Sequence, residues 1–510
     1  MLHGRPPKKR QPGASMPTLL DTDGYKFSMQ EAGFPLRRET FYYSHRRGGW
    51  QYNPVDIPAF IRALLPTVRP EDYAFLDGHN YFLGGAFRDA IRRVDEVRVN
   101  AIPKGAWFYD REPVFTVTGP SALVSWLEPL ALQLNRRIQI ATRALLDPAS
   151  LPELCGNATC EEEATITRET LGTVGVTCAF PITIEANRYQ QDVDARVKRL
   201  VAIVENPDRI FEVGMRAVSC PAQHELALAV IRDAGVLRTS NVGAAARLGM
   251  VPVGTMGHEH IMRHGTDYAA FVAMRDRVPG FISYLPDTFD TVASGLPSAL
   301  RVLAEDKTRN SGIRFDSEHG IRGHYLYAVC RAREQGFVPY LMLESGWDDA
   351  LTTEFERLRE LVEWPAERQG YGIGGFLVKP GWAHLGRDTV SAVWKVTQSG
   401  DSARMKIGDE PGQGKASIPG RPVVWRPHLG MSGYGGPVGY VAQEGENWTP
   451  PVPATLLSGL DDPPPSVAFR VGEILGFAQR PRGIAYSPGT QSLVDAAYRL
   501  RKESIAAAMG

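Results

Sequence analysis

The chain has 510 residues, more than a single hydrophobic core usually organises, so its length predicts at least two domains. Lysine plus arginine and aspartate plus glutamate both total 57, and this balance argues against a nucleic-acid binder driven by bulk charge. The sequence has no apolar run of transmembrane length and no signal-peptide segment at its start, and its five cysteines favour a reducing, cytoplasmic setting over a disulfide framework.

The first fifteen residues carry a basic run, Pro6 to Arg10, without apolar periodicity, and we expect residues 1–15 to be a disordered tail. A nuclear or nucleic-acid signal is the other reading of that run. Further on, Phe41 to Arg47 reads as a strand that enters a basic turn. Arg46 or Arg47 can hold a phosphate there, or can simply be solvated.

Residues 16–135 are expected to form the first part of an α+β domain. Apolar spacing predicts helices at Pro58 to Leu65 and at Pro120 to Thr142. Between them, the alternation over Val97 to Val117 suits strands.

The segment from Asp147 to Asp208 differs in composition, and we read it as an insertion that makes a hairpin or flap. It contains Cys155, Cys160 and Cys178 near an acidic run. A zinc site is the alternative, but the segment has no Cys-x-x-Cys pair and no histidine. We therefore assign no residue as a metal ligand.

From Ile210 the pattern changes to repeated strand–helix units, which predict a parallel sheet, and so many units favour an irregular TIM-like α/β barrel over residues 136–384. The predicted strands are Met250 to Gly254, Phe281 to Pro286, Gly312 to Phe315, Val338 to Leu343 and Gly372 to Val378. The predicted helices are Ala222 to Ala234, Ser294 to Asp306, Tyr325 to Glu334 and Leu351 to Glu363.

Polar clusters follow the ends of these strands, and in a parallel barrel the carboxyl ends of the strands usually carry the chemistry. They are Thr239 to Asn241, Thr255 to His260, Asp287 to Asp290, Asp316 to Ser317 and Glu344 to Gly346. Ser240 or Asn241 is also placed to cap a short helix that Gly249 can end.

After the barrel, Val390 to Val424 returns to β-like alternation, and residues 385–450 are expected to complete the α+β domain. Residues 451–510 read as a proline-rich linker followed by a tail helix, Gln491 to Met509, with Thr490 placed to cap it.

Eight short motifs occur in one order between about residue 17 and residue 425, and together they resemble the nicotinate phosphoribosyltransferase family, of the type II phosphoribosyltransferase fold. They are Thr22-Asp23-x-Tyr25 with Met29, Glu212-x-Gly214-x-Arg216, Thr239-Ser240-Asn241, Gly254-Thr255-Met256-x-His258, Asp287-Thr288-Phe289-Asp290, Gly312-Ile313-Arg314-x-Asp316-Ser317, Gly372-Ile373-Gly374 and Lys415-x-x-x-Pro419-Gly420.

The resemblance implies an irregular α/β barrel packed on a second domain made from both the N-terminal and post-barrel segments. It implies a homodimer with shared active sites, and neither nucleic acid nor a membrane as a partner. The implied reaction joins nicotinate to phosphoribosyl pyrophosphate for NAD salvage, with Mg²⁺ on the pyrophosphate. It also implies ATP as a co-substrate, coupled through a transient phosphohistidine.

This chemistry needs position and electrostatics rather than a general base, because the pyridine nitrogen is already a nucleophile. Asp316 suits the ribose hydroxyls or the developing cation, and Arg46 and Arg314 suit phosphate oxygens. Ser345-Gly346 and Gly374-Gly375 suit the 5′-phosphate, because backbone N–H groups can approach there. A plain turn is the other reading of the glycine pair.

For the pyridine, the resemblance assigns Tyr25 to stack on the ring from the partner subunit. Arg216 can pair with the carboxylate or a nearby phosphate, and Ser240 and Asn241 belong to the same site. Relatives that act on nicotinamide carry an aspartate at the place of Ser240, so serine favours nicotinate. The motif before His258 makes it the phosphorylated residue rather than part of a metal cluster with His260, whose spacing is not that of a zincin.

The chain departs from the family pattern in two places. Glu318-His319 follows Asp316-Ser317 where glycine and aspartate are usual, and Val213 stands where an aromatic residue usually flanks the ring. Two alternatives therefore stay open: transfer to another pyridine, nicotinamide or quinolinate, and a catalytically silent barrel that binds nucleotides.

Overall fold

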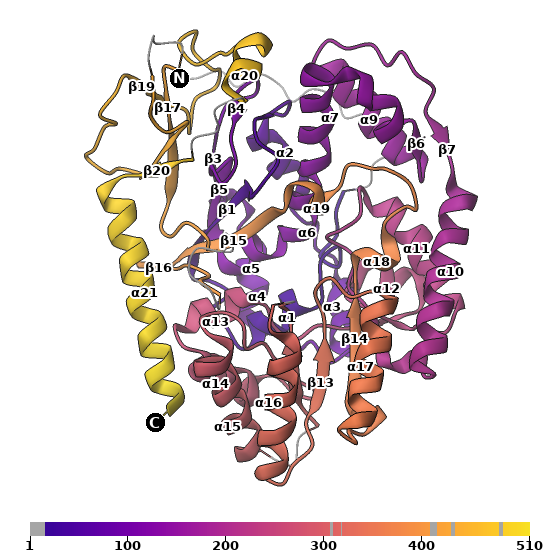
Figure 1. The fold of residues 1–510 in the computed structure, drawn as a ribbon. Helices are drawn as coiled ribbons and strands as arrows, with labels where there is room; N and C mark the ends of the chain where they lie inside the picture. Colours follow the sequence, from indigo (N-terminus) through magenta and orange to yellow (C-terminus); the bar gives the residue numbers. More distant parts are fainter. Residues whose placement is uncertain are drawn as a thin grey trace.

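The structure is a computed structural model. It describes residues 16–306, 310–317, 319–408, 416–429, 434–478 and 483–509, so the tail predicted for residues 1–15 lies outside it. A five-stranded sheet and a seven-stranded sheet organise the chain, with helices packed on both (Figure 1). Within the described ranges, no helix is long and apolar enough to cross a membrane.

The five-stranded antiparallel sheet combines segments from both sides of the barrel, as predicted. Its order is β16-β15-β1-β5-β3. Three strands come before the barrel, β1 (Arg38–His45), β3 (Arg98–Ala101) and β5 (Phe115–Pro120), and two come after it, β15 (Ala392–Ser399) and β16 (Ser402–Ala403). Aromatic and β-branched residues suit its buried face, where the rings of Tyr43 and Phe115 stack with centroids 5.0 Å apart. A separate two-stranded pair, β2 (Gln51–Tyr52) and β4 (Trp107–Phe108), lies beside it.

The helices of this domain are short. They are α1 (Tyr25–Glu31), α2 (Ile57–Leu64), α3 (Pro70–Gly78), α4 (Gly85–Ala90), α5 (Ser121–Trp126), α6 (Glu128–Leu132) and α7 (Leu134–Leu146). The single helix predicted over Pro120 to Thr142 is thus divided into three. Pro129 has no backbone N–H and is accommodated only in the first turn of a helix, which accounts for the break between α5 and α6. The boundary expected at residue 136 falls inside α7.

The seven-stranded sheet is entirely parallel, with the order β10-β9-β8-β14-β13-β12-β11. Its strands are β8 (Ile210–Glu212), β9 (Arg238–Thr239), β10 (Val251–Pro252), β11 (Ser283–Tyr284), β12 (Gly312–Phe315), β13 (Tyr340–Leu343) and β14 (Gln369–Ile373). The helices that follow them are α11 (Pro221–Asp233), α12 (Val242–Leu248), α13 (His258–His264), α14 (Asp267–Arg277), α15 (Leu296–Glu305), α16 (Ile321–Glu334), α17 (Asp349–Leu361) and α18 (Gly375–Val378).

This sheet curls into a half-barrel whose edge strands, β10 and β11, are not paired with each other within the described part of the chain. A side chain spans the gap instead: Thr255 Oγ1 donates to the Ser283 carbonyl at 3.1 Å and accepts from its N–H at 3.4 Å. The predicted irregular TIM-like barrel with a second α+β domain is therefore confirmed.

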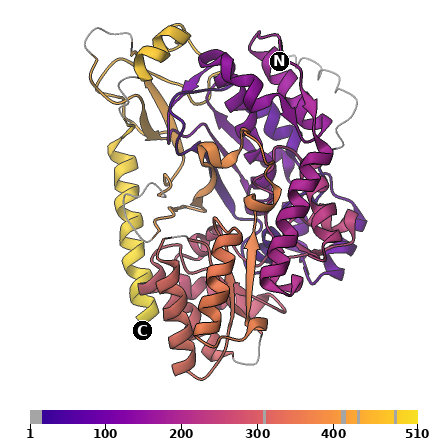
Figure 2. The ribbon, with the colours of Figure 1, turned by 45° about the vertical axis from the view of Figure 1, so that its right-hand side comes forward.

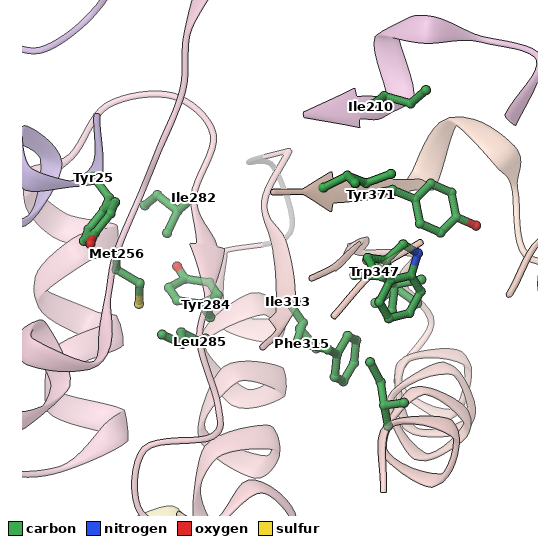
Figure 3. Close-up of a cluster of buried hydrophobic side chains, with 14 of the residues drawn as sticks. Tyr25, Ile210, Met256, Ile282, Tyr284, Leu285, Ile313, Phe315, Trp347 and Tyr371 are labelled. Atoms are coloured by element: carbon green, nitrogen blue, oxygen red, sulfur yellow. The ribbon is translucent and has the colours of Figure 1, made fainter. Parts of the chain in front are cut away.

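The half-barrel encloses one large apolar core. Side chains from successive strands meet inside it, among them Ile210, Tyr284, Ile313 and Tyr371 (Figure 3). Tyr25, from α1 of the other domain, joins the same cluster. The N-terminal segment therefore packs on the barrel of its own chain.

The segment from Asp147 to Asp208 is mostly helical, so the predicted hairpin or flap is wrong. It holds α8 (Leu151–Cys155), α9 (Glu161–Thr173) and α10 (Ala186–Val204), with a parallel pair, β6 (Asn157–Ala158) and β7 (Thr183–Ile184). The buried side chains of α10 recur every three or four residues and enter the barrel core: Tyr189, Val193, Val197, Leu200 and Val204. The second half of the segment, α10, is therefore a helix that covers the barrel.

The C-terminal part forms a sheet that the sequence reading did not separate. Its order is β19-β17-β18-β20, from β17 (Pro422–Pro427), β18 (Tyr440–Gln443), β19 (Ala454–Leu456) and β20 (Ala485–Tyr486). α20 (Val471–Ala478) precedes the long α21 (Pro488–Met509). Thr490, the predicted cap, lies inside α21; its N–H is accepted by Ser487 Oγ at 3.1 Å, just before the proline that starts the helix.

Asp267 gives a pH-dependent contribution to stability. It is fully buried between α14 and α21, where it accepts hydrogen bonds from Ser294 and Ser504, and burial raises its pKa to about 7. The native state therefore keeps a proton that the unfolded chain loses near its reference pKa of ~3.9. The stabilisation by protonated Asp267 is complete below that pKa and is lost as the pH rises to about 7. The free energy of unfolding falls by up to ~4 kcal/mol over this range.

We expect Asp267→Asn to flatten the fall in Tm between pH 5 and pH 8, measured by calorimetry. Asp233→Asn, on the exposed part of α11, is the matched control and should keep the native slope. An unchanged slope in Asp267→Asn would show that this carboxyl group does not titrate in that window.

Candidate functional site

Two neighbouring cavities are lined by residues at the carboxyl ends of the barrel strands, and the smaller one also reaches the segment before β11. The smaller, of about 240 Å³, is lined by Tyr25, Phe211, Arg216, Ser240 and Arg314 among others. The larger, of about 880 Å³, is lined by a set of cations, by His258 and Asp316, and by the loops after β13 and β14. Val213, Arg216 and Glu344 line both cavities and mark the junction between them.

Arg216 is held at this junction by buried carboxylates from the N-terminal domain. Its guanidinium lies 3.5 Å from Glu128 and 3.7 Å from Asp23. Tyr25 donates to Glu128 at 2.8 Å, and the Lys26 ammonium lies 2.6 Å from the same carboxylate. A ring bound beside Tyr25 would therefore meet a fixed cation.

Asp23 and Ser240 form a buried pair in the smaller cavity. Ser240 Oγ donates to Asp23 Oδ1 at 2.7 Å, while Oδ2 accepts no hydrogen bond within the described part of the chain. Burial raises the pKa of Asp23, although Arg216 and Ser240 oppose that shift. The cavity thus holds a carboxyl group that sequence reasoning gave no role.

His258, the first residue of α13, is the centre of a polar cluster in the larger cavity. Its Nδ1 lies 3.0 Å from Thr288 Oγ1, and its Nε2 lies 2.7 Å from Lys406 Nζ. Because an ammonium can only donate, Nε2 is the acceptor and Nδ1 carries the proton that Thr288 accepts. Burial, with the Lys406 charge beside it, lowers the pKa of His258 to about 4. The imidazole is therefore a neutral nucleophile at ordinary pH.

Two aspartates face the same imidazole. Asp316 Oδ2 lies 3.5 Å and Asp287 Oδ2 lies 3.8 Å from Nε2. Burial opposes the ionisation of Asp316, but the charges of Arg314 and Lys406 hold its pKa well below its usual range. Asp316 is thus a carboxylate poised beside the cavity.

Arg314 and Glu344 complete the floor of the site. Arg314 donates to the Met256 carbonyl at 2.9 Å and lies 3.7 Å from Asp316 and 3.6 Å from Glu344. Gly372 makes room for Glu344: a Cβ at that glycine would lie 2.2 Å from Glu344 Cγ. Any side chain there would push this carboxylate out of the junction.

The larger cavity is strongly cationic. Its basic residues are Arg46, Arg47, Arg196, Arg216, Lys379, Arg387, Lys395 and Lys406. Burial lowers the pKa of Lys395 to about 7; Glu128 opposes this shift, and the positive charges of Lys406, Arg46 and Arg216 add to it. Ser345, in the loop after β13, has a φ of 74°, so it carries backbone strain at the cavity wall; Gly346, with a φ of 67°, adopts the same region without that penalty.

Most residues predicted for the site line these cavities. Tyr25, Arg216, Ser240 and Arg314 line the smaller one; Arg46, Arg216, His258, Asp316, Ser345, Gly346, Gly374 and Gly375 line the larger one. Tyr25 reaches the cavity of its own chain, whereas the resemblance assigned it to a partner's site. Glu318 and Lys415 lie outside the described residues.

Asn241 does not join the others. Its Oδ1 caps α12 by accepting the Ala244 N–H at 3.0 Å, and its Nδ2 contacts His224 Nδ1 at 2.9 Å. His224 in turn contacts Glu212, whose carboxylate accepts the N–H of Gly214. Asn241 therefore supports the loop that carries Arg216.

Sequence reasoning missed several groups that surround the site. They are Asp23, Lys26, Glu128, Asp287, Thr288, Arg387, Lys395 and Lys406. Asp23, Asp287 and Thr288 lie inside quoted motifs, so motif membership was the available signal. Lys395 and Lys406 are basic residues in predicted strands, a pattern that strand spacing alone does not connect to a barrel site.

Comparisons with known proteins point to one enzyme family. No family model matches the chain. The nicotinate phosphoribosyltransferase of Bacillus subtilis is 29% identical over 203 residues, which cover 38% of each chain. The human nicotinate phosphoribosyltransferase is 27% identical over 356 residues, covering 67% of this chain and 62% of the relative. The chain is similar in sequence to members of the nicotinate phosphoribosyltransferase family.

Solved structures agree with this similarity at the level of the fold. The nicotinate phosphoribosyltransferase of Porphyromonas gingivalis superposes with a TM-score of 0.57 at 18% identity, over 78% of this chain and 96% of that one. A putative nicotinate phosphoribosyltransferase of Saccharomyces cerevisiae gives a TM-score of 0.56 at 16% identity, over 78% and 94%. In sequence, the chain spans 38% of the length of the Bacillus subtilis relative and 62% of the length of the human relative.

Proposed function

We propose that this protein transfers a phosphoribosyl group from phosphoribosyl pyrophosphate to nicotinate, giving nicotinate mononucleotide and pyrophosphate. The observation that carries the proposal is the junction of the two cavities. A small pocket with aromatic walls opens at Arg216 and Glu344 into a large cationic cavity. That arrangement suits a flat acid on one side and a polyphosphate on the other.

The reaction forms a bond between the pyridine nitrogen and the anomeric carbon and breaks the bond from that carbon to the pyrophosphate oxygen. Positive charge builds on the ribose and negative charge on the leaving group. Glu344 at the junction and Asp316 in the larger cavity can stabilise the first; Lys395, Lys406 and Arg387 can stabilise the second. The chain thus supplies position and electrostatics and needs no base.

Mg²⁺ would neutralise pyrophosphate charge when bound. No group of three or more His, Cys, Asp and Glu side chains placed to hold a metal occurs among the described residues. Asp287 Oδ1 is buried and has no hydrogen-bond partner among the described residues. The Oδ2 atoms of Asp287 and Asp316 lie 3.8 Å and 3.5 Å from the same atom, Nε2 of His258. These two carboxylates fit an ion whose remaining ligands are pyrophosphate oxygens and water.

ATP coupling is the second part of the proposal. The γ-phosphoryl group of ATP would pass to Nε2 of His258, with ADP as the leaving group, and water would later release phosphate. Lys406, 2.7 Å from Nε2, can neutralise the transferring group. The homodimer implied by the resemblance stays part of the proposal, although Tyr25 and Arg46 line cavities of their own chain.

One assay tests this function directly. Purified protein is incubated with nicotinate, phosphoribosyl pyrophosphate and Mg²⁺, with and without ATP, and nicotinate mononucleotide and pyrophosphate are measured. Nucleotide formation that increases with ATP supports both the transfer to nicotinate and its coupling to ATP. ATP binding without product from any pyridine would instead favour the silent nucleotide-binding barrel.

Nicotinamide is the second candidate substrate, because Asp23 places a buried carboxyl oxygen in the smaller cavity that an amide could donate to. We expect nicotinate to be preferred, since Arg216 also lines this pocket. Ser240→Asp should lower kcat/KM for nicotinate about tenfold or more. The substitution places a second carboxyl group beside Asp23, and this group would repel the carboxylate of the substrate.

Ser240→Asn is the matched control for this prediction, with nearly the same volume as aspartate and no charge. It should retain the preference for nicotinate. Equal kcat/KM for acid and amide in the native protein would contradict the assignment of nicotinate.

A further inference from the structure

The tail helix α21 connects the C-terminal sheet to the barrel. At its start, Thr490 Oγ1 accepts from Gln443 at 3.0 Å, and the Gly489 N–H donates to Glu446 at 2.9 Å. Both views of the fold show the helix running from that sheet along the side of the molecule to the barrel helices α14 and α15 (Figures 1 and 2). It is therefore anchored at both ends.

The barrel end of α21 holds one particular loop. The Arg501 guanidinium donates to Asp290 Oδ2 at 2.6 Å. Ser504, one turn further along, lies 2.7 Å from Ser294 Oγ and donates to Asp267 at 3.0 Å. Asp290 and Ser294 belong to the turn that links β11 to α15, so the helix grips this turn at two points.

The same turn carries side chains of the site. Asp290 Oδ1 accepts the Ala293 N–H at 2.8 Å and so caps a π-helical turn, Thr291–Gly295. Two residues earlier, Thr288 Oγ1 lies 3.0 Å from Nδ1 of His258. The turn is packed too closely to shift freely, since a Cβ at Gly295 would lie 1.9 Å from the Pro286 carbonyl oxygen.

A second contact ties the turn to Lys406. The Thr288 carbonyl accepts the N–H of Gly408 at 3.1 Å, in the segment that brings Lys406 to Nε2 of His258. A shift of Asp290 would therefore displace the groups that contact both nitrogens of the imidazole, Thr288 at Nδ1 and Lys406 at Nε2. Packed turns of this kind pass displacement along instead of absorbing it.

We propose that α21 is a positioning element for His258, and that Arg501 is the positioning residue, acting through Asp290 and Thr288. The inference rests on the proposed function, since it assigns Arg501 to the phosphoryl-accepting step. Both members of the pair are about four-fifths buried, with 18% and 20% of their side chains exposed, so the pair holds the helix and the turn in one geometry. A role in geometry is the better account of an ion pair that joins the tail to this turn.

The test compares Arg501→Gln, Arg501→Lys and the control Lys502→Gln in the full chain. Lys502 is the next residue of α21 and is exposed. Arg501→Gln should slow labelling of His258 by γ-labelled ATP about tenfold, because a displacement near 1 Å is enough for such a loss. It should change ATP-independent synthesis less than about twofold, and Arg501→Lys should restore most of the labelling rate.

Hydrogen exchange gives a readout that does not depend on activity. The amides of Ala293, Ser294 and Gly295 should exchange faster in Arg501→Gln and at the native rate in Lys502→Gln. Unchanged exchange, or an equal loss of labelling and of ATP-independent synthesis, would overturn the inference. If the native protein acquires no label, the ATP coupling fails, and exchange alone decides whether α21 holds the turn.

Discussion

Asp316→Asn is expected to lower kcat/KM for nucleotide formation by about 10²–10³-fold while leaving the protein folded. Asparagine keeps the volume of the side chain and removes its charge. In the native protein this carboxylate lies 3.5 Å from His258 Nε2 and 3.7 Å from Arg314, at the mouth of the larger cavity. The loss of its charge removes stabilisation of the ribose cation and leaves Arg314 with Glu344 as its remaining carboxylate.

Steady-state kinetics and calorimetry together decide this prediction. Asp316 lines the cavity and is 27% exposed, so Asp316→Asn should leave a cooperatively folded protein whose fall in Tm reflects only the lost ion pair with Arg314. Asp233→Asn, exposed on α11, should retain native kinetics. Near-native turnover in Asp316→Asn would remove this residue from the mechanism, and a large fall in Tm would assign it to stability.

Local sequence patterns predict the barrel and the strand-end residues well, for a physical reason. Parallel strands bring their carboxyl ends to one edge, so Arg314, Asp316, Ser345 and His258 converge without any knowledge of tertiary contacts. The same reasoning places Ser240 correctly. It assigns its neighbour Asn241 to the site as well, although that side chain is turned to cap α12.

Charge pairs between distant segments are beyond such patterns. Lys26 meets Glu128 and Glu259 in a buried cluster, from positions 102 and 233 residues away. Lys406 reaches His258 across 148 residues. Nothing in the local sequence of either lysine specifies its partner. Packing of the second domain on the barrel brings Lys26 to Glu259 and Lys406 to His258, whereas Lys26 meets Glu128 through the fold of the second domain itself.

The insertion differs from these charge pairs, because its local sequence does contain the pattern of a helix. The apolar residues of α10 recur at helical spacing, from Tyr189 to Val204, and this period predicts a helix with one buried face. The composition of the whole segment, with its cysteines and acidic run, concealed that period. A window confined to residues 186–204 indicates the helix that the structure contains.

His258→Asn is expected to abolish the label from γ-labelled ATP and, with it, the stimulation of synthesis by ATP. ATP-independent synthesis should persist, because the bond between nicotinate and ribose does not use the imidazole. The label on the native protein should be acid-labile and base-stable. His428→Asn, whose ring contacts Thr455 in the C-terminal sheet, is the matched control and should label normally.

The pH dependence of labelling separates this site from an ordinary histidine. Burial and the Lys406 charge lower the pKa of His258 to about 4, so the neutral imidazole persists well below pH 6. An unperturbed histidine, with a pKa of ~6.5, would lose most of its nucleophilic form between pH 8 and pH 5.5. The initial rate of labelling should therefore change little over that range, once ATP is saturating. A label that persists in His258→Asn would place the phosphoryl group elsewhere, and a rate that falls with an apparent pKa near that of free histidine would show that the cluster around Nε2 opens when ATP binds.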